Sequence, residues 1–117
     1  MISIRGATTI LNNSEEEINK NTIELINEII SANNLNVEKI HTMIFSCTDD
    51  ITKAYPGAYV RKYFDMKKLS LMHFNEMKVD NYLKLCIRVL ILSDEDKDQV
   101  KFVYLNNAKS LRKDLNQ

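Results

Sequence analysis

The hydrophobic pattern is clearest in residues 83–92, which are rich in Leu, Ile and Val and contain neither Gly nor Pro. A polar, turn-forming run at residues 93–96 follows, and together these features predict a buried β-strand. Side chains alternate between the two faces of a strand, so every second residue shares a face. One face is then uniformly apolar and consists of Leu85, Ile87, Val89 and Ile91.

The opposite face of this strand carries Arg88 at its middle, between Cys86 and Leu90. A guanidinium in such a place loses hydration, which is costly unless an anionic group meets it. One interpretation is a structural ion pair or an exposed strand face, and the pattern by itself favours this. The other is a preorganised cation that meets an anionic ligand or developing negative charge.

The rest of the chain predicts further strands and helices. Strands are predicted at residues 2–9, 40–47, 68–73 and 100–105, helices at residues 15–32 and 56–64, and a helical turn at residues 108–115. The long helix has the clearest boundaries, because Ser14 and Glu17 form a capping box and Asn33-Asn34 end it. Gly6 predicts a bulge or a close backbone approach within the first strand.

This order of elements, β-α-β-α-β-β-β, predicts a single α+β domain over residues 1–117. Its mixed sheet would have about five strands, with both helices packed on one face. The other face is not obviously solvated, because it includes Cys86, Leu90, Leu92, Phe102 and Tyr104. An uncovered apolar sheet face predicts an oligomer in which sheets pack together.

Composition narrows the classes of function. Sixteen basic residues balance sixteen acidic ones, which argues against broad electrostatic binding to nucleic acid. No apolar run reaches the length of a membrane span, and the first residues lack a signal-peptide layout. Cys47 and Cys86 lie apart, which is typical of free thiols in a reducing cytoplasm, and with only His41 and His73 besides we expect no metal site.

Two further polar groups carry weaker signals. Asp49-Asp50 ends the second strand, and such adjacent acids in a loop are usually solvated rather than catalytic. Residues 61–68 hold several Lys and Arg residues close to tyrosines. This basic patch is better explained as a solvated helix face than as a nucleic-acid surface, and its aromatic residues could equally form a subunit contact.

A set of short motifs occurs in one order along the chain. They are Ile4-Arg5-Gly6-Ala7-Thr8-Thr9, Tyr55-Pro56, Glu76-Met77, Cys86-Ile87-Arg88-Val89, Val103-Tyr104-Leu105 and Leu111-Arg112. Together they resemble the AroH-class chorismate mutases, a family of small monofunctional enzymes, over nearly the whole chain. The resemblance implies an isomerase that converts chorismate to prephenate in the biosynthesis of phenylalanine and tyrosine. It also implies no cofactor, no metal and no covalent intermediate.

The resemblance further implies a homotrimer, in which sheets surround a barrel-like core and each active site lies between neighbouring subunits. By motif, Arg88 would face the ether oxygen of chorismate and a nearby carboxylate. Arg5 and Tyr104 would bind the side-chain carboxylate, and Glu76 would accept the ring hydroxyl.

The remaining substrate-binding residues would complete the cleft. Tyr55 and Arg61 would come from the neighbouring subunit, and Leu111 and Arg112 would belong to a tail that covers the site. His73 stands where the family typically has Cys, next to the hydroxyl-binding site, and would add positive charge below about pH 6.5. A second departure is Ala58, at a position that is often Lys in the family.

The same cations would also serve a non-catalytic trimeric module that binds small carboxylates and regulates a partner. Glu76 separates the two hypotheses, because a binder of dicarboxylates gains nothing from an acid in its pocket. A purely structural oligomerisation domain would leave Arg5 and Arg88 unexplained.

Overall fold

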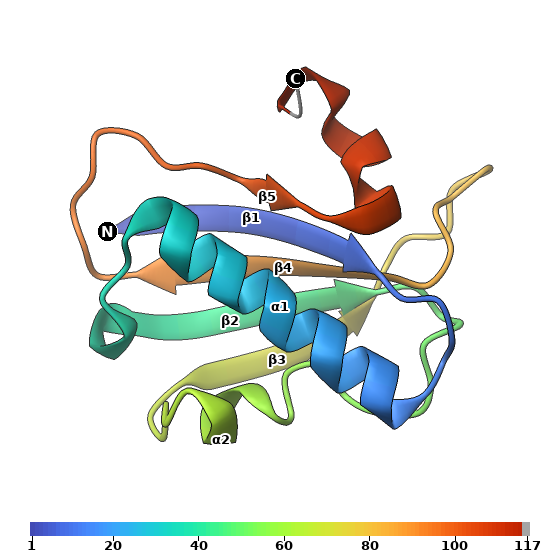
Figure 1. Ribbon diagram of the computed structural model, residues 1–117, viewed down its shortest axis with the longest axis horizontal. Helices are drawn as coiled ribbons and strands as arrows, with labels where there is room; N and C mark the ends of the chain where they lie inside the picture. The colour runs from blue at the N-terminus through green and yellow to red at the C-terminus, as the bar shows by residue number, and fades with distance from the viewer. Residues whose placement is uncertain (116–117) are drawn as a thin grey trace.

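A five-stranded mixed sheet forms the centre of the fold (Figure 1). The computed structural model describes residues 1–115 of the chain. The strands are β1 (Ile2–Thr9), β2 (Ile40–Cys47), β3 (Ser70–Asn75), β4 (Cys86–Ser93) and β5 (Val103–Tyr104), arranged in the order β3-β2-β4-β1-β5. Strand β4 runs antiparallel to both of its neighbours, β1 and β2. The edge strands are parallel to theirs, β3 to β2 and β5 to β1.

The long helix α1 (Glu15–Asn33) crosses one face of this sheet (Figure 1). Ser14 is confirmed as the N-cap, because its hydroxyl accepts a hydrogen bond from the Glu17 amide at 3.2 Å. The other half of the predicted capping box is not formed, because the Ser14 amide donates to the Asn12 carbonyl and the Glu17 carboxylate accepts the Leu11 amide. Its end is also confirmed, since Asn34 adopts the left-handed conformation that closes a helix. The apolar side of α1 is fully buried and includes Ile18, Leu25, Ile26 and Ile29.

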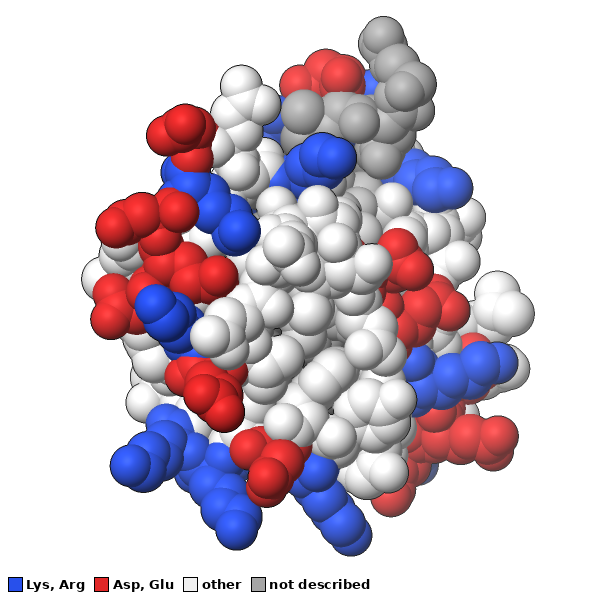
Figure 2. Space-filling view, turned by 60° about the vertical axis from the view of Figure 1, so that its left-hand side comes forward, with Lys and Arg blue, Asp and Glu red and all other residues white. Residues whose placement is uncertain are grey.

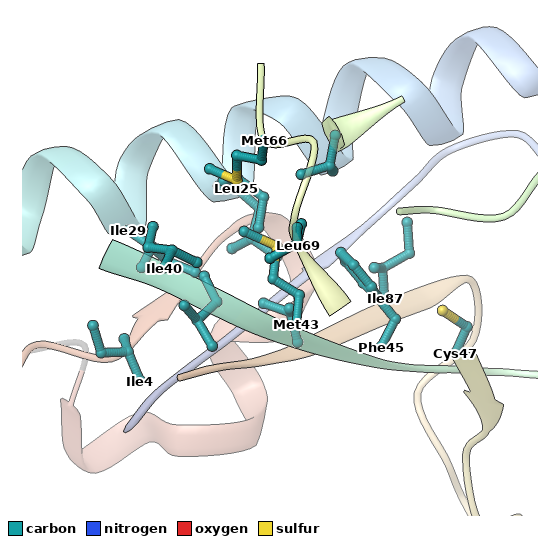
Figure 3. Close-up of a cluster of buried hydrophobic side chains, with 14 of the residues drawn as sticks. Ile4, Leu25, Ile29, Ile40, Met43, Phe45, Cys47, Met66, Leu69 and Ile87 are labelled. Carbon is teal, nitrogen blue, oxygen red and sulfur yellow. The ribbon is translucent and has the colours of Figure 1, made fainter. Parts of the chain in front are cut away.

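Gly6 of β1 lies directly beneath side chains of α1. A Cβ atom at Gly6 would lie 2.6 Å from Cδ1 of Ile29 and 3.1 Å from the carbonyl oxygen of Val103. The glycine therefore marks a close backbone approach, one of the two outcomes predicted for it. The core lies between α1 and the sheet, and Figure 3 shows side chains from both meeting there, including Ile4, Met43, Phe45 and Ile87.

The shorter helices differ from the sequence prediction. Helix α2 spans only Val60–Tyr63, whereas a helix was predicted at residues 56–64. Residues 56–59 form turns instead, with hydrogen bonds from Ala58 to Tyr55 and from Val60 to Gly57 that span three residues. A glycine in this segment weakens helix formation. Two 3₁₀ helices complete the fold, η1 (Val37–Lys39) and η2 (Asn106–Leu115), the second replacing the helical turn predicted at residues 108–115.

Three strand boundaries also differ from the prediction. The structure shows the physical cause of two of these shifts. Strand β5 begins at Val103 rather than at residue 100, because the Asn33 side chain bonds both the amide and the carbonyl of Lys101 at 2.6 and 2.9 Å. Strand β4 begins at Cys86 rather than at residue 83, because Leu85 has a positive φ of 49°. Strand β3 lies two residues further along the chain than predicted.

The prediction that the helices cover only one sheet face is confirmed, since α1 and α2 both pack into the same core cluster. On the other face, Ile44, Leu90 and Leu92 remain half-buried. Met72 and Phe74 of β3 are 57% and 51% exposed there. An apolar surface of this kind is typical of a subunit contact.

Charged side chains do not gather into a single block on the face drawn in Figure 2, where acidic and basic residues are intermingled around an uncharged area. That face therefore has no extended basic surface of the sort used to bind nucleic acid. Within the described part of the chain, no helix is both long and apolar enough to cross a membrane.

Candidate active site

One level of the sheet brings the main candidate residues into a row, on the face away from α1. Arg88 of β4 lies opposite Ser46 of β2 on one side and Ala7 of β1 on the other. Ala7 in turn lies opposite Tyr104 of β5. Glu76 directly follows β3 and donates its amide to the carbonyl of Cys47 at 2.8 Å. The row therefore runs from β2 to β5, with a small residue on each side of Arg88 and with Glu76 just beyond the end of β3.

Arg88 and Glu76 form an ion pair, with 3.1 Å between Nε and Oε1. Their side chains are 33% and 23% exposed. Nε of Arg88 is buried but is not aligned for a hydrogen bond to any described residue, so this is a contact between charges. The Ser46 hydroxyl donates to the same Oε1 of Glu76 at 3.0 Å. Ser46 thereby orients the carboxylate, a role that the sequence analysis missed.

The ion pair lines a cavity of about 690 Å³. This is a size typical of small-molecule sites. Its walls include Cys86 and Leu83 as well as Leu111 from η2. The ion pair faces open space that a ligand can enter. The arrangement therefore favours the interpretation of Arg88 as a preorganised cation.

Tyr104 and the C-terminal residues lie next to this cavity. Tyr104 is only 5% exposed and packs with Ala7, Cys86 and Ala108, with Leu111 against the same cluster. Arg112 is held by Asp114, and this hydrogen bond raises the pKa of the guanidinium, with Tyr104 contributing in the same direction. Leu111 lines the cavity, as predicted, and the next residue, Arg112, is paired with Asp114.

Arg5 lies on the same sheet face as Arg88. It is opposite Leu90 and two residues before Ala7, so its side chain points to the side that carries the cavity. It is exposed and has no ion pair with another described residue. Arg5 does not line the cavity itself, but an unpaired cation on the same face suits an anionic ligand.

A network at the start of β4 fixes the position of Arg88. Both carboxylate oxygens of Asp50 accept the Leu85 amide, at 3.0 and 3.1 Å. Thr48 donates its hydroxyl to Asp50 at 2.6 Å and accepts the Cys86 amide at 2.9 Å. These hydrogen bonds hold Leu85 at its positive φ. Leu85 lies two residues before Ile87, the residue that precedes Arg88. The expectation of a solvated loop acid is wrong for Asp50.

The two thiols do not serve as nucleophiles in this site. Cys47 and Cys86 are buried and free. Burial raises the pKa of Cys47 to about 12 and that of Cys86 to about 11, the latter against an opposing effect of Arg88. Both thiols therefore stay protonated at neutral pH. The described residues also contain no cluster of His, Cys, Asp and Glu side chains suited to a metal.

A second group of candidates lies elsewhere in the same chain. The Tyr55 ring is 69% exposed and its centre is 5.2 Å from that of His73. His73 stacks on the core residue Phe45, so it projects from the α1 face of the sheet. Arg61 is exposed on α2 and donates Nε to the Leu69 carbonyl at 3.0 Å. None of the three lines the cavity of Glu76 and Arg88.

This separation bears on two sequence predictions. Tyr55 and Arg61 lie away from the cavity of their own chain, which is compatible with the prediction that they line the cleft of a neighbouring subunit. That prediction is not tested by a single chain. For His73, the expected place beside the hydroxyl-binding Glu76 is wrong within one chain, because the two side chains lie on opposite faces of the sheet. If His73 reaches a substrate cleft, it does so from the same side as Tyr55.

Comparisons with known proteins identify the family of the chain. The sequence model described as Chorismate mutase type I matches residues 1–115. Chorismate mutase AroH of Bacillus subtilis is 37% identical over 96% of this chain and 90% of its own length, and AroH of Thermus thermophilus is 36% identical over 96% and 93%. A chorismate mutase structure from Clostridium thermocellum, 37% identical, superposes with a TM-score of 0.88 over 94% of this chain and 99% of its own. The chain therefore belongs to the type I chorismate mutase family.

Proposed function

We propose that this protein rearranges chorismate to prephenate at the cavity lined by Glu76 and Arg88. The observation that carries the proposal is the adjacent carboxylate and guanidinium, 3.1 Å apart, on the wall of a ligand-sized cavity. Membership of the family supports the same reaction, which belongs to phenylalanine and tyrosine biosynthesis. The free thiols support a cytoplasmic location.

The reaction needs electrostatic help rather than a nucleophile. Chorismate is a dianion whose ether C–O bond breaks while a C–C bond forms, and negative charge develops on the ether oxygen. A catalyst therefore has to supply cations for the carboxylates, a donor at the ether oxygen and walls that hold the reactive conformer. A millionfold acceleration corresponds to about 8 kcal/mol of transition-state stabilisation.

Arg88 is suited to the ether oxygen. Its position in a central strand fixes the guanidinium, and Glu76 holds Nε on one side. The other guanidinium nitrogens are then available for the ether oxygen and a nearby carboxylate. Because the charge is in place before the reaction starts, little reorganisation is needed as negative charge grows.

Glu76 has a different task, since an acid next to a dianion is otherwise unfavourable. Its carboxylate accepts the ring hydroxyl and faces the electron-poor part of the transition state, and Ser46 keeps it oriented. Arg5 and the Tyr104 hydroxyl bind the side-chain carboxylate. Leu111 supplies an apolar cover from η2, with Arg112 beside it.

We also propose that the active form is a homotrimer with its sites between subunits. The half-exposed apolar face of the sheet supports an oligomer, with Met72 and Phe74 as its most exposed members. The cavity of one chain is open, and Tyr55 and Arg61 project from another side of the molecule. A neighbouring subunit would supply these two residues as an apolar wall and a further cation for the dianion.

A non-catalytic module that binds small carboxylates is the alternative. It would use Arg5 and Arg88 in the same way, but the oriented carboxylate of Glu76 would oppose its ligand. The site therefore fits a ligand that has a hydroxyl as well as carboxylates, as chorismate does.

The first prediction is that the purified protein converts chorismate to prephenate without added metal or nucleotide. Loss of chorismate absorbance with time measures this, and prephenate is identified as the product. Protein that is folded and oligomeric but gives no turnover above the uncatalysed rate would contradict the proposed function.

The second prediction concerns Arg88. If it stabilises transition-state charge, Arg88→Ala lowers kcat by a factor of about a thousand or more while substrate affinity changes much less. Arg88→Lys restores little, because Lys lacks the planar fork. Thermal melts run beside the kinetics: a variant that loses stability but keeps near-normal kcat would make Arg88 a structural residue only.

The third prediction compares two adjacent acids. Asp50→Asn weakens the network that fixes the start of β4 and lowers kcat/KM by about tenfold, since misplacing a charge by a fraction of an ångström is costly. Asp49→Asn is the matched control, because Asp49 only forms an exposed ion pair with Lys78 at 3.5 Å, and it changes kcat/KM by less than about twofold.

A second substitution tests whether Asp50 acts by positioning the start of β4 or only by stabilising the fold. Adding Leu85→Gly to Asp50→Asn relieves the positive φ that Asp50 maintains and recovers part of kcat/KM. Equal effects of the Asp49 and Asp50 substitutions would show that the network does not position Arg88.

The fourth prediction tests the shared cleft. Arg88→Ala damages one wall, and Arg61→Glu damages the other by repelling a dianion. Co-refolding equal amounts of the two variants gives mixed trimers in about three-quarters of cases, each with one intact cleft, so about a quarter of all clefts are restored. Activity then rises well above that of either parent. If mass spectrometry finds mixed trimers while activity stays at the parents' average, both residues serve one chain's site.

A further inference from the structure

His73 connects β3 to the segment of residues 55–57. Its Nε2 accepts a hydrogen bond from the Gly57 amide at 2.9 Å. Its ring stacks on Phe45, with 5.2 Å between ring centres and 11° between planes, and the Tyr55 ring lies tilted against it at the same distance. A single imidazole thus contacts the core on one side and an exposed aromatic residue on the other.

The segment is pressed tightly against these two rings. A Cβ atom at Gly57 would lie 2.8 Å from Cε2 of Phe45 and 3.0 Å from Nε2 of His73. Pro56 and Gly57 are buried, whereas Tyr55 is 69% exposed. The hydrogen bond from Gly57 and this close packing both tie the segment that carries Tyr55 to the sheet.

This hydrogen bond requires a neutral imidazole. Nε2 has to carry a lone pair to accept the Gly57 amide, so the proton of neutral His73 is on Nδ1. The other titratable groups around the same cavity of about 650 Å³ are Cys47, Lys53 and Tyr55, and none of them is a carboxyl group. A protonated imidazole would have no opposite charge there, and burial lowers the pKa of His73 below its ordinary 6.5.

We propose that neutral His73 is a positioning residue that holds residues 55–57 against the sheet, and that protonation of Nε2 releases them and displaces Tyr55. The consequence for catalysis rests on the proposed function, in which Tyr55 forms part of a substrate cleft. The effect has the opposite sign to the one expected from sequence. Acid does not improve binding of the dianion through added charge, but weakens it through loss of a wall.

The sign of the pH dependence follows from the lowered pKa. Above pH 6.5 His73 is neutral in both the folded and the unfolded protein, and the interaction is fully present. As pH falls below 6.5, the unfolded chain takes up the proton first, so the stability supplied by this contact declines. The contact itself breaks as pH falls through the lower pKa of folded His73.

NMR tests the structural half of the proposal without an activity assay. In the intact protein at about pH 8, long-range ¹H–¹⁵N correlations place the His73 proton on Nδ1, and the Gly57 amide proton resonates downfield. On acidification the Gly57 amide moves upfield with the same midpoint as His73, and its hydrogen exchange accelerates. The chain has two histidines, so His41→Gln is the control and leaves this titration unchanged.

Two substitutions of His73 separate the effect of its ring stacking from the effect of its hydrogen-bond acceptor. His73→Gln keeps an acceptor for Gly57 but does not titrate, and His73→Phe keeps the stack on Phe45 but has no acceptor. With the loss of one hydrogen bond, KM for chorismate rises about fivefold in His73→Phe at about pH 8 while kcat changes little. In the unsubstituted protein KM rises by a similar factor on acidification, and in His73→Gln it stays flat.

The outcomes are distinct. A Gly57 amide that does not follow the His73 titration overturns the proposal, whatever the activity. An amide that follows it in an active enzyme whose KM stays constant, or rises equally in His73→Gln, overturns the link between this segment and substrate binding. A folded protein without mutase activity contradicts the proposed function instead, and the amide titration then still decides whether His73 holds the segment.

Discussion

The register of β4 between β1 and β2 is the constraint on which the rest of the structure depends. Side chains alternate strictly along a strand, so a slip of one residue would turn Arg88 into the core and Ile87 out of it. Val89 and Ile91 are buried in the core cluster to which α1 also contributes, which makes such a slip very costly. The Leu85 and Cys86 amides donate hydrogen bonds to Asp50 and Thr48, which fixes the point at which the strand begins. The same register therefore buries the apolar core and places Arg88 on the open face.

The two sheet faces differ because the α-helices cover only one of them, while the other meets only the 3₁₀ helix η2 near Tyr104. The α1 face holds the apolar core, and the open face holds the row from Glu76 to Tyr104. An ion pair on the open face keeps part of its hydration, so the cost of desolvation is far smaller than in a closed core. A dianionic substrate that displaces the remaining water would then meet charges already in place.

Much of the fold could be predicted from sequence, since its signals are local. Strands β1 and β2, the Ser14 cap and the Asn34 end of α1 follow from alternation and capping chemistry within a few residues. The α+β class and the one-sided helix layer follow from the order of these elements. The ordered motifs around Arg5, Glu76 and Arg88 indicated chorismate mutase chemistry, and the family assignment is confirmed.

Contacts between residues that are far apart in the sequence determine several strand boundaries and side-chain orientations that local patterns do not predict. The Asn33 side chain shortens β5, and Asp50 holds Leu85 in a conformation that no strand propensity predicts. Ser46 orients Glu76 from a strand thirty residues earlier in the chain. His73 binds Gly57 on the face away from Glu76. Sequence determined which residues alternate, cap and bury, because these depend on neighbours along the chain; the tertiary structure decided which side chains meet, because hydrogen bonds and charges act through space.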